Sequence, residues 1–369
     1  MARSAGLSLA SPLSCYRPGM PEWPFQPPRK PMEALADARF PEPPGWAYEP
    51  KWDGFRALAW SAGADGEPRL DSRNERPLLR YFPELRGALD ALPAGTVVDG
   101  EIVVVTGDVT DFDALQQRIH PAESRIERLS AETPAQLVAF DLLAIDGEDL
   151  RAEPFETRRA RLEALLGGLD APWSLTPSTH DLATAEEWHA RFEAAGCDGI
   201  VAKRLDGRYV EGKRDMVKIK HRHTIDAVVG GYRVHKEGDR IGSLLLGMYD
   251  ADGAMHFVGH ISGFPDEERV ALLARFEALR ADASFGEDAR QPGMESRWSQ
   301  RRESGFVPVR PEVVVEASYD QTTGGRLRHA ARFERWRPDK QPEECTLDGL
   351  GRPEGAGFGD VLAEARRDA

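Results

Sequence analysis

The chain has few cysteines and no long apolar run, and each shortage excludes a class of protein. Its 369 residues include only three cysteines, Cys15, Cys197 and Cys345, and no CxxC pair. This pattern excludes a disulfide framework and the common zinc modules, and it favours a reduced, cytoplasmic compartment. No stretch approaches the roughly 18 uncharged apolar residues that a membrane-spanning helix needs. The short apolar stretch near the start is broken by Pro12, so we do not interpret it as a signal peptide.

Two common nucleotide-binding patterns are also missing. The sequence contains no GxxxxGK[ST] loop and no HRD…DFG pair, which excludes a P-loop ATPase and a protein kinase. The net charge of −14 excludes a chain that is basic all over. Binding to nucleic acid would therefore depend on local basic patches.

Lysine is scarce, although the chain is rich in positive charge. Of the 48 basic residues only eight are lysine, and the rest are arginine. Where arginine serves as the general cation, a lysine is a candidate for chemistry that a guanidinium cannot perform, such as nucleophilic attack or compact charge on a phosphate. Lys30 and Lys236 have uninformative neighbours and need no such explanation. The other six lysines include Lys51, Lys203, Lys218, Lys220 and Lys340, which lie in the motifs described below.

The chain length and the change in local sequence pattern along the chain predict two domains. A chain of 369 residues is longer than one typical domain. Residues 1–31 are proline-rich and are expected to form an extended tail or a strap. Residues 32–221 alternate strand and helix signals. Residues 222–346 contain short strands, Gly and Asp turns and one helix at 265–281, which suit a small β-barrel such as the OB-fold. Residues 347–369 are expected to be a weakly ordered tail.

Apolar periodicity predicts the main elements of the first domain. They are a hairpin made by 48–60 and a Gly-rich turn, a helix over 78–92, two short strands in 96–105 that pivot at Asp99-Gly100, a short helix at 111–119, a buried strand at 136–145, a helix opened by a capping box at 184–187, and strands at 197–204 and 216–220.

Seven short motifs carry residues that suit phosphate chemistry. In chain order they are EPKWDGFR (49–56), SRNERP (72–77), DGE (99–101), FDLL (140–143), DGIVAK (198–203), KIK (218–220) and RWRPDK (335–340). The Lys51 amine can attack phosphorus once its neighbours activate it. Lys218 and Lys220 share one face of a strand, where two like charges favour an anion between them. Taken alone, each motif also fits a surface turn, a core aromatic or a solvated charged face.

Together, and in this order, the motifs resemble those of the covalent nucleotidyltransferase superfamily and, within it, the ATP-dependent DNA ligases. The resemblance covers about residues 45–345. Longer strings such as EPKWDGFRAL, LQQRIHPAESR and IGSLLLG are most similar to the short bacterial repair-type ligases called ligase C, and also to the ligase domain of ligase D. The resemblance implies an α+β fold, with a nucleotidyltransferase (ATP-grasp-like adenylation) domain at 32–221 followed by an OB-fold β-barrel domain at 222–346.

The resemblance also implies roles for individual residues. Lys51 would be the nucleophile that forms a lysyl-AMP intermediate. Glu101 and Asp198 would hold Mg²⁺ (or Mn²⁺), although the family usually has Glu where this chain has Asp198. The residues implied to bind ATP are Glu49, Arg56, Arg73, Glu101, Phe140, Lys203, Lys218, Lys220, Arg337 and Lys340. Among these, Glu49 would contact the adenine amino group, Phe140 would stack on the ring, and Arg73 would hold the 5′-phosphate of a nick.

The implied substrate is nicked or broken double-stranded DNA, in DNA repair and recombination. By the same resemblance we expect a monomer in the bacterial cytoplasm, associated with the nucleoid, with no membrane partner and with Ku and a separate primase-polymerase as partners. No large DNA-binding, polymerase or phosphoesterase module is visible, so we expect modest, salt-sensitive DNA affinity. The alternatives are an RNA ligase or capping-type nucleotidyltransferase, and a non-catalytic OB protein that binds nucleic acid.

Overall fold

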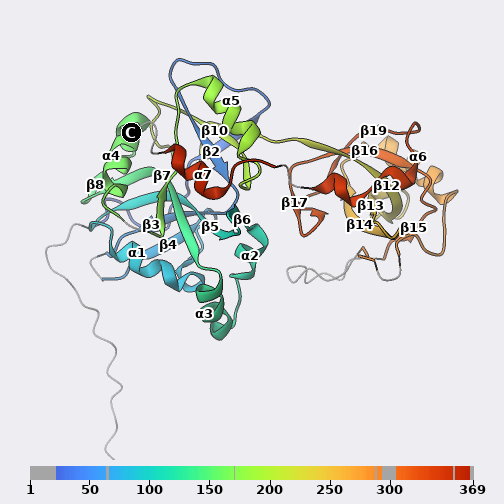
Figure 1. Ribbon diagram of the computed structural model, residues 1–369, viewed down its shortest axis with the longest axis horizontal. Helices are drawn as coiled ribbons and strands as arrows, with labels where there is room; N and C mark the ends of the chain where they lie inside the picture. The colour runs from blue at the N-terminus through green and yellow to red at the C-terminus, as the bar shows by residue number, and fades with distance from the viewer. Residues whose placement is uncertain are drawn as a thin grey trace, which may run out of the picture. The chain divides into compact units, whose positions relative to one another are not determined.

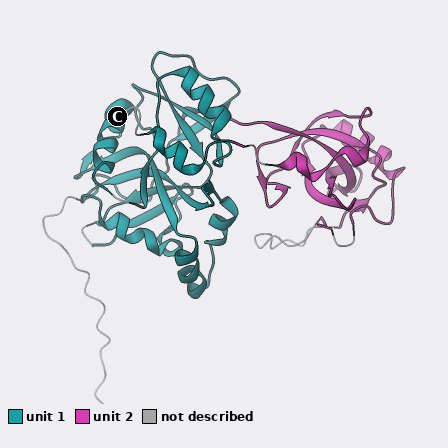
Figure 2. Cartoon of the chain, viewed as in Figure 1, with its two compact units in different colours: residues 1–219, 355–369 teal, residues 220–354 magenta. Residues whose placement is uncertain are grey.

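The computed structural model describes residues 22–63, 66–169, 171–286, 289–292, 305–351 and 354–365. The chain divides into two compact units, shown in different colours in Figure 2. Unit 1 contains residues 1–219 and 355–369, and unit 2 contains residues 220–354. The chain therefore crosses between the units twice, near residue 219 and again near residue 355. The sequence predicted only the first of these crossings.

Unit 1 is built on two sheets (Figure 1). The first sheet has the strand order β1 (Glu33–Asp37), β11 (Arg214–Lys220), β10 (Cys197–Arg204), β2 (Trp46–Trp52). The second has the order β4 (Arg69–Ser72), β3 (Phe55–Trp60), β5 (Val97–Thr106), β7 (Ala135–Ile145), β8 (Glu148–Asp149), with β6 (Val109–Thr110) paired to β5 and β9 (Trp173–Leu175) paired to β7.

The predicted hairpin is only partly correct. Strands β3 and β4 form it across the Gly-rich turn, whereas β2 pairs with β10 in the other sheet. The chain changes sheets at residues 53–54, directly after Lys51 and Trp52. Residues 97–106 form one strand rather than the two that were predicted, because a β-bulge at Asp99-Gly100 bends the pairing with β7 without ending it.

Eight helical segments of unit 1 fall in the described residues. They are η1 (Leu79–Tyr81), η2 (Pro83–Leu85), α1 (Arg86–Asp90), α2 (Phe112–Gln117), α3 (Glu123–Glu132), α4 (Phe155–Leu166), α5 (Leu182–Arg191) and α7 (Phe358–Glu364). The single helix predicted over 78–92 is wrong: Pro83 lacks a backbone N–H, and the segment breaks into η1, η2 and α1. The capping box predicted at Thr184 is also wrong, because Asp181 caps α5 and accepts a 2.9 Å hydrogen bond from the Thr184 N–H.

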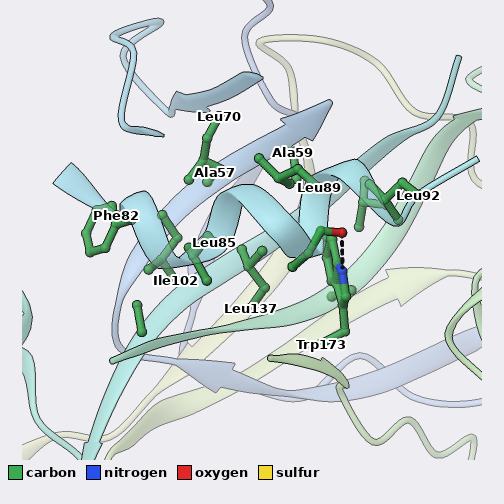
Figure 3. Close-up of a cluster of buried hydrophobic side chains, with 14 of the residues drawn as sticks. Ala57, Ala59, Leu70, Phe82, Leu85, Leu89, Leu92, Ile102, Leu137 and Trp173 are labelled. Carbon is green, nitrogen blue, oxygen red and sulfur yellow. Dashed lines mark hydrogen bonds between the residues drawn. The ribbon is translucent and has the colours of Figure 1, made fainter. Parts of the chain in front are cut away.

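The main core of unit 1 covers the outer face of the second sheet. Figure 3 shows Leu85 and Leu89 from the helical segment packed over Ile102 and Leu137 of the sheet. The indole of Trp173 donates a 3.0 Å hydrogen bond to the Ala88 carbonyl, which fixes the helical segment to the neighbouring strand. This packed layer therefore covers one face of β5.

The other face of β5 is apolar at both ends of the strand and polar in the middle. Val97 belongs to an apolar cluster with Val201 and Met216 of the first sheet, whereas Val103 belongs to a second apolar cluster. Asp99 and Glu101 lie between these two positions on the same face. The two apolar clusters therefore bracket a polar region between the sheets, and the predicted site residues lie there.

Both terminal segments pack on unit 1. Trp23 and Phe25 make edge-on ring contacts with Trp60 at 5.4 and 5.5 Å, which fits the predicted strap, although residues 1–21 lie outside the described part. The C-terminal segment is not a weakly ordered tail over its described residues. Its helix α7 buries Val361 and places Phe358 against Trp52, with ring centroids 5.4 Å apart. The few apolar residues of this segment gave too weak a pattern to predict a packed helix.

Unit 2 is a curled antiparallel sheet with one main helix. Its principal sheet has the order β14 (Met255–Ile261), β13 (Ile241–Tyr249), β12 (His223–Val234), β16 (Val314–Tyr319), β19 (Arg332–Trp336). Smaller elements are α6 (Asp266–Glu277), β15 (Val307–Pro308), β17 (Thr322–Thr323), β18 (Arg326–Leu327), η3 (Pro342–Glu344) and η4 (Leu347–Leu350).

The sheet of unit 2 curls until its edges meet. A bridge between Ile261, at the end of β14, and Ala331, just before β19, joins the two edge strands. This is the small β-barrel that the sequence predicted. In the part of the chain that the structure describes, no helix has the length and apolar character needed to cross a membrane.

Candidate active site

Lys51 lies near the end of β2, opposite a β-bulge in β10. Cys197 pairs with Trp52 and Ile200 pairs with Pro50, so both Asp198 and Gly199 lie opposite Lys51. Gly199 has a φ of 133°, which a residue with a side chain rarely adopts. The bulge turns the Asp198 carboxylate toward Lys51, and the two form an ion pair of 2.6 Å from Nζ to Oδ2. The Lys51 side chain is 23% exposed and Asp198 is buried, so the amine is oriented by a carboxylate yet remains accessible.

Glu49 lies two residues before Lys51, on the same face of β2. It is 2% exposed, and its Oε2 lies 2.7 Å from the Lys203 Nζ. The Arg159 guanidinium, from α4, lies 3.3 Å from Oε1. Burial raises the pKa of Glu49, and the charges of Lys203 and Arg159 oppose that shift. The buried Glu49 carboxylate, a hydrogen-bond acceptor, is thus held between the positive charges of Lys203 and Arg159.

Phe140 is placed by another bulge. Asp99 pairs with Asp141 and Gly100 pairs with Ala139, so Phe140 is an extra residue in β7 with no partner on β5. Its ring lies 4.8 Å from the Lys203 Nζ, and its carbonyl accepts a 2.7 Å hydrogen bond from the same amine. The ring is only partly buried. It therefore offers a face on which a planar group can stack.

Arg56 lies directly across from Glu101 in the pairing of β3 with β5. Its guanidinium makes two hydrogen bonds to Asp99, of 3.0 and 2.6 Å, and lies 5.2 Å from the Phe140 ring centroid. The Tyr209 hydroxyl donates a further 2.6 Å hydrogen bond to Asp99. Asp99 is fully buried, so this network fixes the orientation of Arg56 from behind.

Glu101 is a further carboxyl near Lys51. Burial raises its pKa to about 8, Lys51 and Arg56 oppose the shift, and Asp53 and Asp99 add to it. Within the described residues no three His, Cys, Asp or Glu side chains form a metal site by themselves. Mg²⁺ usually takes one or two carboxylates, with water and substrate phosphates as its other ligands. Glu101 and Asp198 both lie near Lys51 and carry the donor type that Mg²⁺ accepts.

Gly54 allows β3 to lie close to β5 at the site. A Cβ at this position would lie 2.2 Å from the Ile102 carbonyl oxygen and 2.8 Å from the Glu101 Cγ. Only glycine permits this approach, and it brings Arg56 level with Glu101. The glycine of the KWDG motif is thus explained by packing alone.

Lys218 and Lys220 lie at the end of β11, with the buried Ile219 between them on the opposite face. Met216 packs in the same apolar cluster as Val201, so Lys218 shares the face of the first sheet that carries Glu49 and Lys203. Lys220 is the first residue of unit 2, and its Nζ lies 3.2 Å from an Asp320 carboxylate oxygen.

Three other predicted residues have ion-pair partners outside this cluster. Arg73 is 59% exposed and makes a 2.8 Å ion pair with Glu33 of β1. Arg337 and Lys340 belong to unit 2, where both contact Asp226 of β12, at 2.8 and 2.9 Å. Unit 1 therefore brings together Glu49, Lys51, Arg56, Glu101, Phe140, Asp198 and Lys203.

Sequence reasoning missed the residues behind this cluster. The sequence indicated Asp99 only as a strand pivot and as part of the DGE motif, and it gave no role to Tyr209, Arg158 or Arg159. Arg158 and Arg159 lie next to each other in a helix, and both are buried. The one available signal was their place on a helix that also carries the buried Phe155 and Leu162, because an arginine on an apolar face needs a partner.

Comparisons with known proteins agree with the geometry. Residues 30–220 match the family described as ATP dependent DNA ligase domain, and residues 237–340 match the ATP dependent DNA ligase C terminal region. DNA ligase C of Mycobacterium tuberculosis is 48% identical over 359 residues, which cover 93% of this chain and 99% of that protein. The multifunctional non-homologous end joining DNA repair protein LigD of the same organism is 33% identical over 311 residues, which cover 82% of this chain and 37% of that protein.

A solved structure of a Lig E DNA ligase has the same fold, with a TM-score of 0.54 at 17% sequence identity, covering 83% of this chain and 99% of that one. The two sheets of unit 1 and the barrel of unit 2 fit the fold of a nucleotidyltransferase domain followed by an OB-fold domain. The chain belongs to the ATP-dependent DNA ligase family, enzymes that use ATP to join DNA strands. Neither the RNA ligase or capping alternative nor the non-catalytic alternative is favoured by these relatives.

Proposed function

We propose that Lys51 is the residue that carries AMP. Its amine would attack the α-phosphorus of ATP, forming an N–P bond while the bond to the bridging oxygen breaks and pyrophosphate leaves. The amine must first release its proton to solvent, which reaches its 23% exposed side chain, and Asp198, 2.6 Å away, is placed to hold Nζ in one direction. The single observation that carries the proposal is this ion pair, set at a bulge beside Arg56 and Glu101. Clustered cations and fixed geometry are the main needs of phosphoryl transfer.

The neighbouring side chains suit the rest of the nucleotide. We assign Glu49 to the adenine amino group, the Phe140 ring to stacking on the base, and Arg56 with Glu101 to the ribose. Lys203 would support Glu49 and Phe140, since it contacts both. Lys218 and Lys220 would neutralise the α-phosphate. In unit 2, Arg337, Asp339 and Lys340 would orient the pyrophosphate.

Glu101 and Asp198 would hold the divalent cation, Mg²⁺ or Mn²⁺. When bound, such a cation supplies positive charge to the phosphates of the substrate. The raised pKa of Glu101 supports this assignment, because a nearby cation would relieve the cost of ionising a buried carboxyl.

Magnesium should therefore stabilise the protein through these carboxylates. We expect MgCl₂ to raise the melting temperature of the wild type at pH 7.5, and to raise that of Glu101→Gln by less than half as much. Calorimetry measures this in the presence of an ATP analogue whose α,β-bridging oxygen is replaced by a methylene group, because the analogue supplies phosphates to the cation but cannot transfer AMP. Glu148→Gln, which changes an exposed glutamate of the same unit, is the matched control and should behave as the wild type does. Equal magnesium stabilisation of wild type and Glu101→Gln would remove Glu101 from the cation site.

We propose that the substrate is a nick or break in double-stranded DNA, with Arg73 near the 5′-phosphate. AMP would pass from Lys51 to that phosphate, and attack by the 3′-hydroxyl would then release AMP and form the phosphodiester. The kinship with ligase C and the end-joining protein LigD supports a place in DNA repair and recombination. We extend the proposal to Ku and a primase-polymerase as partners, and to a monomer in the bacterial cytoplasm that associates with the nucleoid.

Sealing of synthetic nicks tests the substrate. With Mg²⁺ and ATP, we expect the wild type to seal a nick flanked by DNA on both sides, and to leave unsealed a nick in double-stranded RNA of the same sequence. A third substrate with ribonucleotides only on the 3′ side measures tolerance there. Lys236→Ala, which removes an exposed lysine of unit 2, is the matched control for Lys51→Ala. Preferential sealing of the RNA nick would refute the DNA assignment.

A further inference from the structure

Arg159 makes three directional contacts from α4. Its Nε donates a 2.6 Å hydrogen bond to the Glu163 carboxylate, its second terminal nitrogen donates a 2.8 Å bond to the Thr176 carbonyl, and its first lies 3.3 Å from the Glu49 carboxylate. The side chain is 9% exposed. A guanidinium fixed in this way at three points has one orientation, so its contact with Glu49 is directional.

The same contacts reach the strand that carries Lys51. The Trp52 indole donates a 2.9 Å hydrogen bond to the Thr176 hydroxyl, while Arg159 binds the carbonyl of that residue. Glu49 and Trp52, on either side of Lys51, are thereby tied to one point after β9. None of the seven motifs contains Arg159 or Thr176, so this support was invisible in the sequence pattern.

We infer that Arg159 is a positioning residue that selects adenine over guanine by keeping Glu49 ionised and fixed in direction. The inference rests on the proposed function, in which Glu49 faces the 6-position of the base. Adenine carries an amino group there, which donates to a carboxylate. Guanine carries a carbonyl oxygen at the same place, which a carboxylate repels. An ionised Glu49 can only accept hydrogen bonds, so its charge state decides which base fits.

The charges around Glu49 explain why Arg159 matters. Lys203 on β10 and Arg159 on α4 favour the ionised form, Asp141 on β7 opposes it, and burial opposes it more strongly. Glu163, on the outer side of Arg159, partly offsets the arginine charge. Without Arg159, only Lys203 would favour the ionised form of the Glu49 carboxylate. A larger fraction of Glu49 would then be protonated, and a protonated carboxyl can donate a hydrogen bond to the guanine oxygen.

The test is the ratio of protein labelling by α-³²P-ATP to labelling by α-³²P-GTP, measured on the full chain at pH 6 and pH 8. We expect Arg159→Gln to lower this ratio by about tenfold or more, with the larger change at pH 6. Arg159→Lys keeps the charge and should retain most of the preference for ATP. Arg161→Gln, two residues along the same helix, is the matched control and should leave the ratio unchanged. A purely structural role would lower both labels together and leave the ratio constant.

The outcomes separate this inference from the proposed function. If Glu49→Gln lowers the ratio while Arg159→Gln leaves it at the wild-type value, Arg159 is not the selecting residue although the nucleotide site is correct. If the wild type forms no labelled band with ATP, the proposed function itself fails. Should Arg159→Gln not fold, Arg159→Lys still decides, because a ratio that falls as far as in Glu49→Gln would overturn the inference that the positive charge at position 159 keeps Glu49 ionised.

Discussion

Lys51→Ala is expected to abolish the covalent adenylate. With α-³²P-ATP and Mg²⁺, the wild type should give a labelled band that survives denaturing electrophoresis, and the variant should lose about 10⁴-fold or more of the labelling rate. The physical reason is that Lys203, the one other lysine among the residues that unit 1 brings together, cannot take over. Lys203 is buried and bound to Glu49, so its amine is not available to a phosphate.

The variant should nevertheless keep the later chemistry. A nick whose 5′-phosphate already carries AMP needs no lysine nucleophile, so Lys51→Ala should seal it at a rate within about tenfold of the wild type. Lys236→Ala should behave normally in both assays. A labelled band that persists in Lys51→Ala would assign the nucleophile elsewhere, and loss of sealing on the pre-adenylated nick would indicate that the variant is misfolded.

Arg158→Met is expected to destabilise unit 1 by about 3–5 kcal/mol, because it leaves the Asp141 carboxylate buried without its counter-charge. Arg158 is 0% exposed and Asp141 is 1% exposed, and two hydrogen bonds of 2.8 and 2.9 Å join them. Arg158 also donates to the carbonyls of Glu153 and Gly207, so several elements loosen together. Urea unfolding followed by circular dichroism measures the loss.

The double variant Arg158→Met/Asp141→Leu provides the internal control. It removes both charges, so we expect it to recover most of the lost stability. Arg161→Ala breaks the exposed pair with Glu148 on the same helix and should cost less than about 1 kcal/mol. A double variant that is no more stable than Arg158→Met would mean that packing, and not the stranded charge, accounts for the loss.

Periodicity in the sequence was sufficient for elements whose apolar residues repeat regularly. The strands at 136–145 and 197–204, the barrel after 222 and the helix near 265–281 were predicted from such repeats and are present. Periodicity failed where a single residue breaks a helix or sets where a helix begins. Pro83 divides a helical pattern, and Asp181 caps α5 one turn earlier than Thr184 suggested.

Local sequence patterns also could not predict how the residues of the candidate site are positioned. Lys51 could be singled out because lysine is rare in this chain, and its motif was visible. The two bulges that aim Asp198 and Phe140 depend on pairings between strands far apart in the sequence, so no local pattern contains them. Arg56 is held by Asp99, 43 positions away along the chain, and Asp99 in turn accepts a hydrogen bond from Tyr209, a further 110 positions along. Burial and long-range pairing, which decide these contacts, exist only after folding.

The return of the chain to unit 1 makes unit 2 an insertion. Helix α7 comes after the barrel in the sequence, yet Phe358 packs on Trp52, next to Lys51. If the backbone is severed at the first crossing, we expect the downstream fragment to remain bound to unit 1, because its helix α7 packs there. In such a split protein the contact between the two fragments would include Trp52, the residue adjacent to the proposed nucleophile.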